Sequence, residues 1–148
     1  MIRLRPATEA DAPGLLALMA TYYAEDSYPL DASRAAAALT PLLSDGPPGR
    51  AWVFVREADV VGYVVATLGY SMEYGGTDAF VDELYLAPDV RGAGLGTQAL
   101  ATVEDWCRAQ GAGAVHLEVE RHREQAQALY RRRGYRDNGR LLLSLRLD

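Results

Sequence analysis

A glycine-rich turn is the part of this sequence whose residue types point most directly to chemistry. It contains Arg91, Gly92, Ala93, Gly94, Leu95, Gly96 and Thr97, between a β-rich run and an amphipathic helical run. Backbone N–H groups at a helix N-terminus are unpaired and partly positive, and glycines let a phosphate approach them closely. Arg91 adds a fixed cation suited to a phosphate oxygen. The turn therefore predicts a binding site for a phosphate-bearing ligand.

The spacing within this turn argues against two common nucleotide motifs. A Rossmann fingerprint would need its third glycine where Thr97 stands, and a P-loop needs a Gly-Lys-Ser/Thr sequence. The chain has 15 basic residues, and all of them are arginine, which also removes Schiff-base chemistry. Neither ATP nor NAD is favoured as the ligand.

Helical and β-rich patterns alternate along the 148 residues that must position this turn. A strand at the N-terminus is followed by predicted helices over 8–23 and 31–39, a β-hairpin of 52–56 and 60–68, and a strand over 79–86. The next predicted helix begins between residues 94 and 97 and ends at 110. It is followed by a strand over 115–119, a helix over 123–133 and a strand over 141–147. This order predicts an α/β (α+β) fold with a mixed sheet, in a single domain over residues 1–148.

Composition narrows the class of protein further. The net charge of −5 opposes non-specific binding to nucleic acid or to an anionic membrane, and mildly favours a cationic partner. No apolar run is long enough for a membrane span or signal peptide, so we expect a cytoplasmic protein. The single cysteine, Cys107, and the two histidines form no spaced metal-binding cluster, so no metal is predicted.

Two motifs together resemble the GNAT superfamily of N-acetyltransferases. Arg91, Gly94 and Gly96 match its Arg/Gln-x-x-Gly-x-Gly/Ala motif, and a hydrophobic strand precedes them as in the family. A second family motif, Asn-x-x-Ala-x-x-Leu-Tyr followed by Gly-Phe, is matched by Ala126, Leu129, Tyr130, Gly134 and Tyr135, with Arg123 at the asparagine position. The resemblance covers almost the entire chain and implies a GNAT-like mixed central sheet with helices on both faces.

The resemblance implies acetyl-CoA as the cofactor. Its pantetheine arm would bond to main-chain groups of Leu84, Tyr85 and Leu86, and its pyrophosphate to amides from Gly92 to Thr97. Ala126 would lie beside the cofactor. Arg123 would either meet a phosphate or leave the usual asparagine contact unmade.

Acetylation of an amine requires a base for the ammonium and an acid for the departing thiolate. By resemblance, Tyr130 would be the acid. Asp82 and Glu83 are the candidate bases, and a period of two sends them to opposite faces of their strand. Asp82 resembles the acid that deprotonates the amine in polyamine-type enzymes, and Glu83 would then be a substrate-side or loop-contacting acid. A carboxyl pKa near 4 makes relay through water, or simple anchoring of the cation, as plausible as direct proton transfer.

The acceptor region is also implied by the resemblance. The end of the first helix supplies Tyr22, Tyr23, Glu25 and Asp26, and the loop before the acidic strand supplies Glu73 and Tyr74. Acidic and aromatic groups suit a small cationic amine such as a polyamine, diamine or aminoglycoside. The alternatives are acetylation of a protein N-terminus or lysine, and a non-catalytic acyl-CoA-binding sensor. Homodimer formation through 141–147 would follow by analogy.

Overall fold

The computed structural model describes all 148 residues, which form two compact units, residues 1–118 and 119–148. The first unit contains a five-stranded sheet and helices α1, α2 and α3, and the second contains helix α4. The expectation of a single domain over 1–148 stays a prediction. No helix in the chain is both long and apolar enough to cross a membrane.

The five strands lie in the sheet in the same order as in the chain. They are β1 (Ile2–Pro6), β2 (Gly49–Arg56), β3 (Asp59–Ser71), β4 (Gly76–Leu86) and β5 (Val115–Leu117). Neighbours pair antiparallel except β4 and β5, which are parallel. The predicted hairpin is confirmed, because Arg56 pairs with Asp59 across a tight turn.

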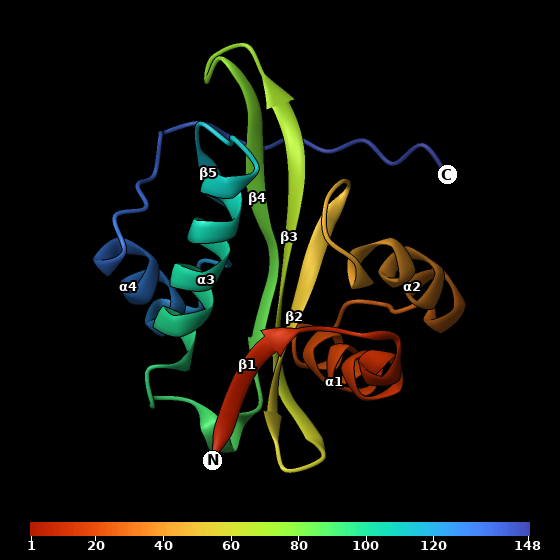
Figure 1. The fold of residues 1–148 in the computed structure, drawn as a ribbon. Helices are drawn as coiled ribbons and strands as arrows, with labels where there is room; N and C mark the ends of the chain where they lie inside the picture. The colour runs from red at the N-terminus through yellow and green to blue at the C-terminus, as the bar shows by residue number, and fades with distance from the viewer. The chain divides into compact units, whose positions relative to one another are not determined.

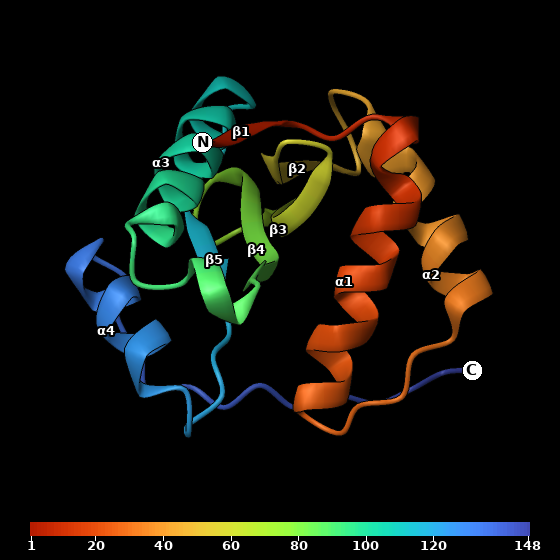
Figure 2. The same ribbon diagram turned by 90° about the horizontal axis from the view of Figure 1, so that it is seen from below.

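Helices cover both faces of this sheet (Figures 1 and 2). Helices α1 (Ala12–Glu25) and α2 (Ala32–Leu39) lie on one face, and α3 (Leu95–Ala109) lies on the other. Short 3₁₀ turns at Glu9–Asp11, Thr40–Leu43 and Pro88–Val90 connect the longer elements. The predicted mixed α/β fold with helices on both faces is therefore confirmed.

The core explains why the middle of the sheet is apolar on both sides. Val53 and Val55 of β2 join Leu15 and Met19 of α1 in one buried cluster. The alternate residue Trp52 contacts Trp106 of α3, with ring centroids 5.5 Å apart. A strand covered on both faces buries all its side chains, so β2 lacks the polar alternation of a half-exposed strand.

Local hydrogen bonds set the beginnings of α1 and α2. The Asp11 carboxylate accepts the Thr8 N–H at 2.7 Å, as the sequence pattern predicts, and a 3₁₀ turn then leads into α1. Asp31 caps α2 by accepting the N–H groups of Ser33 and Arg34. Helix α1 continues to Glu25, two residues beyond the predicted end at Tyr23.

The second unit contains α4 (Glu124–Arg132), within one residue of the prediction at each end. Gly134 follows with φ of +99°, a conformation that favours glycine and ends the helix. The Tyr135 N–H bonds to the Tyr130 carbonyl at 3.0 Å, and the two rings meet edge to face.

The predicted strand over 141–147 is wrong, because this segment forms no ladder and has no regular secondary structure. The predicted strand over 115–119 ends at Leu117. An alternating pattern describes the two faces of a strand but does not supply the neighbouring edge that a strand must pair with. The leucines of this segment are exposed: Leu141, Leu142, Leu143, Leu145 and Leu147.

Candidate active site

The glycine turn connects β4 to α3 and is built to leave amides exposed. Gly92 and Gly94 have φ of +78° and +84°, and a Cβ built on either glycine would meet no atom within 4 Å. Helix α3 begins immediately after Gly94 without a side-chain cap, and its first backbone bond runs from Gln98 N–H to the Gly94 carbonyl at 3.2 Å. The N–H groups before Gln98 in this first turn thus lack helical partners.

This geometry fits a pyrophosphate. Open space over the glycines admits an anion, and the uncapped end of α3 offers partial positive charge. Leu95 and Gly96 are buried and anchor the start of the helix, whereas Arg91, Gly92, Ala93 and Thr97 are exposed.

Strand β4 provides an open edge before the turn. Its register against β3 shifts between Glu83 and Val81, which leaves Asp82 as a bulged residue. The parallel ladder with β5 stops at the same place, with Val81 opposite Leu117. From Glu83 to Leu86, β4 is therefore paired on its β3 side only.

The direction of the β4 main chain follows from one hydrogen bond. The Ala87 N–H donates to the Val61 carbonyl of β3 at 2.9 Å. Because main-chain groups alternate in direction along an antiparallel strand, Leu84 and Leu86 direct theirs away from β3. Tyr85 directs its own toward Tyr63, its partner on β3. Among the three residues proposed to bind pantetheine, Leu84 and Leu86 thus face the open edge.

Glu83 is a carboxylate of the site whose two oxygens are both hydrogen bonded. The hydroxyl of Tyr63 donates to one carboxylate oxygen at 2.7 Å, and the hydroxyl of Tyr23 donates to the other. Burial raises the pKa of Glu83, the two phenols act in the opposite direction, and the Asp82 charge raises it further. Burial beside Glu83 also raises the pKa of both tyrosines, so their hydroxyls stay protonated as donors. Asp82 lies at the bulge with an exposed side chain.

A second carboxylate, Glu25, lies at the end of α1 next to the glycine turn. The Tyr85 hydroxyl donates to it at 2.5 Å, and Arg91 Nη2 lies 3.4 Å from the same carboxylate oxygen. The Tyr22 ring stacks on the Tyr85 ring with centroids 4.7 Å apart. Asp26 caps the C-terminus of α1 and is partly buried.

We call this group of side chains the acidic–aromatic cluster. Its members come from α1, β3, β4 and the glycine turn, all within the first unit: Tyr22, Tyr23, Glu25, Tyr63, Glu83, Tyr85 and Arg91. Two carboxylates, four phenols and one guanidinium are thus linked by hydrogen bonds, an ion pair and ring contacts. Such a group can hold a cation and exchange protons.

Other predicted site residues lie elsewhere. Glu73 and Tyr74 lie in the turn between β3 and β4, at the opposite end of β4 from Glu83. Tyr74 packs on His116, with ring centroids 5.0 Å apart. Their acceptor-binding role stays a prediction.

Three predicted residues, Tyr130, Arg123 and Ala126, belong to the second unit. Arg123 is the N-cap of α4, and the spacing of three and seven residues places all three on one face of that helix. Their proposed roles toward the cofactor stay predictions.

Two features of the first unit were not predicted. Tyr63 is fully buried on β3, where its sequence context indicates only a core residue, yet its hydroxyl fixes Glu83. The signal that could reveal it is that a buried phenol needs a hydrogen-bond partner. His116 and buried Asp78 also pair at 3.1 Å across β4 and β5, and no sequence spacing connects them.

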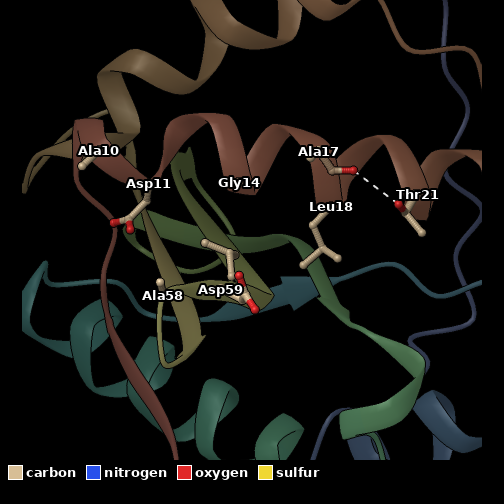
Figure 3. Close-up of a pocket in the computed structure, with 9 residues that line it drawn as sticks. Ala10, Asp11, Gly14, Ala17, Leu18, Thr21, Ala58 and Asp59 are labelled. Atoms are coloured by element: carbon tan, nitrogen blue, oxygen red, sulfur yellow. Dashed lines mark hydrogen bonds between the residues drawn. The ribbon is translucent and has the colours of Figure 1, made fainter.

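A hollow of about 430 Å³ lies between α1 and the β2–β3 turn (Figure 3). Its lining is mainly small or apolar, including Gly14, Ala17 and Leu18. The Asp11 carboxylate at its rim already pairs with Arg5 at 2.7 Å. This hollow contains no member of the acidic–aromatic cluster and is not a candidate active site.

Comparison with known proteins identifies the class that this fold and site define. The chain belongs to the acetyltransferase (GNAT) family, whose model matches residues 15–135. An integron cassette protein from the mobile metagenome of Cole Harbour Salt Marsh has a crystal structure with a TM-score of 0.86 and 38% identity, covering 98% of this chain and 90% of that one.

Two enzymes show more distant similarity in sequence. An aminoalkylphosphonate N-acetyltransferase from Salmonella typhimurium is 29% identical over 57% of this chain, and the match spans 54% of that enzyme's length. An IAA acetyltransferase from Azospirillum brasilense is 28% identical over 79% of this chain and 72% of its own. The match thus spans about half the length of the Salmonella enzyme.

Proposed function

We propose that this protein transfers an acetyl group from acetyl-CoA to a primary amine of a small cationic acceptor. The observation that carries the proposal is the position of Glu83. Two phenols hold its carboxylate, and the strand to which Glu83 belongs leads into the glycine turn. Membership of the acetyltransferase (GNAT) family supports acetyl-CoA as the cofactor. The acceptor classes that we favour are polyamines, diamines and aminoglycosides.

The residues that would hold the cofactor follow from the open backbone groups. Amides from Gly92 to Thr97 would bind the pyrophosphate, and the outward main-chain groups of Leu84 and the N–H of Leu86 would bind the pantetheine arm. The Leu86 carbonyl already accepts from Arg91 Nε. In the second unit, Arg123 and Ala126 are proposed to contact the cofactor. When bound, acetyl-CoA supplies an acetyl thioester that a neutral amine can attack.

Two residues are assigned to proton transfer. Glu83 accepts the proton of the acceptor ammonium, directly or through a water molecule. The raised pKa of Glu83 lies closer to the pKa of an amine than that of an ordinary carboxyl does. Tyr130 donates its phenolic proton to the sulfur as the carbon–sulfur bond breaks. We favour Glu83 over Asp82 as the base, because hydrogen bonds hold both oxygens of Glu83 in place.

The charge of the cluster supports a cationic acceptor. Glu25 and Glu83 carry two negative charges among tyrosine rings, which attract ammonium groups by charge and by cation–π contact. Arg91 opposes them. The same chemistry would also accept a protein N-terminus or a lysine, so the acceptor must be identified by experiment.

The test is a screen of amines with acetyl-CoA, with release of free thiol as the readout. The panel should contain polyamines, diamines, aminoglycosides and lysine peptides. Turnover of small amines in preference to peptides supports the proposal, and Glu83→Gln should lower kcat/KM by about 100-fold or more. Glu57→Gln, on the exposed turn between β2 and β3, is the matched control. Binding of coenzyme A with no turnover of any amine would instead indicate an acyl-CoA sensor.

We also propose that two copies pair through residues 141–147. The exposed leucines of this segment would be buried by a second copy. Sedimentation of the intact chain and of Leu143→Glu should show a dimer and a monomer, respectively, and a monomeric intact chain would contradict this proposal. The cytoplasmic location stays a prediction.

A further inference from the structure

Arg91 connects the glycine turn to the acidic end of α1. Its Nε donates to the Leu86 carbonyl at 2.9 Å, and its guanidinium lies over the Tyr85 ring at 5.3 Å. Its Nη2 lies 3.4 and 3.5 Å from the two carboxylate oxygens of Glu25. Arg91 thus lies in the turn that is proposed to bind the pyrophosphate, and it also pairs with a carboxylate of the acidic–aromatic cluster.

The contact between Arg91 and Glu25 is of a kind that a stronger anion displaces. Both side chains are partly exposed, at 39% and 30%, and the nitrogen–oxygen distances exceed those of a close charge-assisted bond. Exposed ion pairs of this type contribute little to stability. A pyrophosphate carries more charge and offers arginine paired oxygens, so it should compete effectively for the guanidinium.

Glu25 and Glu83 are each held by one of two neighbouring tyrosines. Tyr63 and Tyr85 are direct partners on β3 and β4, with ring centroids 6.4 Å apart. Tyr63 donates to Glu83, and Tyr85 donates to Glu25. Two neighbouring phenols therefore present two separate carboxylates, an arrangement that matches an acceptor with two cationic groups.

We propose that Arg91 is an exchangeable counter-ion for Glu25. Without coenzyme A, Arg91 neutralises Glu25; the pyrophosphate then draws Arg91 away, and Glu25 receives the second, non-reacting ammonium of a dicationic acceptor. This inference rests on the proposed function and adds to it a coupling between the cofactor site and the acceptor site. Because coupling between two sites is reciprocal, the dicationic acceptor also tightens the binding of coenzyme A.

The first experiment measures the affinity of coenzyme A by titration calorimetry. Glu25→Gln removes the competitor for Arg91, so coenzyme A should bind about three- to fivefold more tightly than to the wild type. Asp26→Asn removes an equal charge one residue away and controls for general repulsion of an anion, so its effect should be smaller. In an Arg91→Gln background, Glu25→Gln should no longer improve the affinity.

The second experiment compares 1,4-diaminobutane with butylamine, with and without coenzyme A. In the wild type, coenzyme A should strengthen binding of the diamine more than that of the monoamine, and Glu25→Gln should abolish this difference. Circular dichroism checks that each variant is folded.

These outcomes separate the inference from the proposed function. If the wild type binds coenzyme A but Glu25→Gln binds it equally or more weakly, Glu25 merely positions Arg91 or plays no part, and the exchange is overturned while the acetyltransferase proposal stands. If the wild type binds no coenzyme A, the proposed function fails, and the exchange fails with it.

Discussion

At the scale of single residues, the decisive feature is a carboxylate whose two oxygens are both hydrogen bonded. Glu83 accepts from Tyr23 and Tyr63, and these phenols oppose the rise in its pKa caused by burial. They thereby favour the ionised form that can accept a proton. The two tyrosines act through Glu83 and are positioning residues.

Tyr63→Phe should move the acid limb of the kcat/KM profile to higher pH. Without the Tyr63 hydroxyl, the pKa of Glu83 rises further, so the ionised carboxylate is lost at a higher pH as the solution is acidified. The measurement is the pH dependence of acetylation, compared with Tyr70→Phe, which changes an exposed tyrosine on the same strand. An unshifted acid limb would remove Tyr63 from this role.

At the scale of elements, the beginning of α3 combines a conformational requirement with the proposed phosphate-binding surface. Gly94 and Gly111 stand at the two ends of this helix, both with positive φ and with open space where a Cβ would lie. They differ in what they face, because only Gly94 belongs to the proposed phosphate site.

Gly94→Ala should weaken the binding of coenzyme A by about tenfold or more, whereas Gly111→Ala should leave it unchanged. Both substitutions carry a similar conformational cost, of about 1 kcal/mol, because alanine disfavours positive φ. Calorimetric titration with coenzyme A and urea unfolding of both variants separate binding from stability. Equal affinities in the two variants would contradict the phosphate site at this turn.

The start of α1 depends on an ion pair that titrates in acid. Arg5 binds the Asp11 carboxylate through two nitrogens, at 2.7 and 2.9 Å, and lowers its pKa to about 2. Because the folded-state pKa is depressed, the pair stabilises the protein above the unfolded pKa of 3.8, and this stability is lost as the pH falls through about 2.

Asp11→Asn should therefore lower the free energy of unfolding by about 1–2 kcal/mol at pH 7. The difference from the wild type should shrink below about pH 4. Urea unfolding at pH 7, 5 and 2.5 measures it, with Asp59→Asn at the exposed start of β3 as the control. A difference that persists unchanged at pH 2.5 would show that charge is not its cause.

At the scale of the whole molecule, the proposed acid and base come from different units. Glu83 belongs to residues 1–118, and Tyr130 belongs to 119–148. Catalysis as we propose it requires both units, so Tyr130 is the residue that tests whether the second unit takes part in the chemistry.

Tyr130→Phe should lower kcat by about 100-fold while changing the affinity for coenzyme A by less than about twofold. Loss of the hydroxyl removes the proton donor but keeps the ring that meets Tyr135. The readouts are steady-state turnover and calorimetry, with Tyr135→Phe as the control. If kcat is unchanged, Tyr130 is not the acid.

Much of the fold could be predicted because its signals are local. The hairpin at Glu57, the limits of α4 and the glycine turn before α3 each depend on residues close together in the chain. The prediction of a strand over 141–147 is wrong because a strand must pair with the edge of another strand, and the local pattern of residues does not show whether such an edge is present.

The sequence by itself predicted an anion site at the turn after β4 and placed two acids on the strand before it. Only the tertiary structure decided which acid is held in place, because the phenols that hold Glu83 lie 60 and 20 residues away in the chain. It also decided that Arg91 meets Glu25, 66 residues distant. Spacing along a chain reports on neighbours within one element, whereas hydrogen bonds between elements depend on how the helices pack against the sheet.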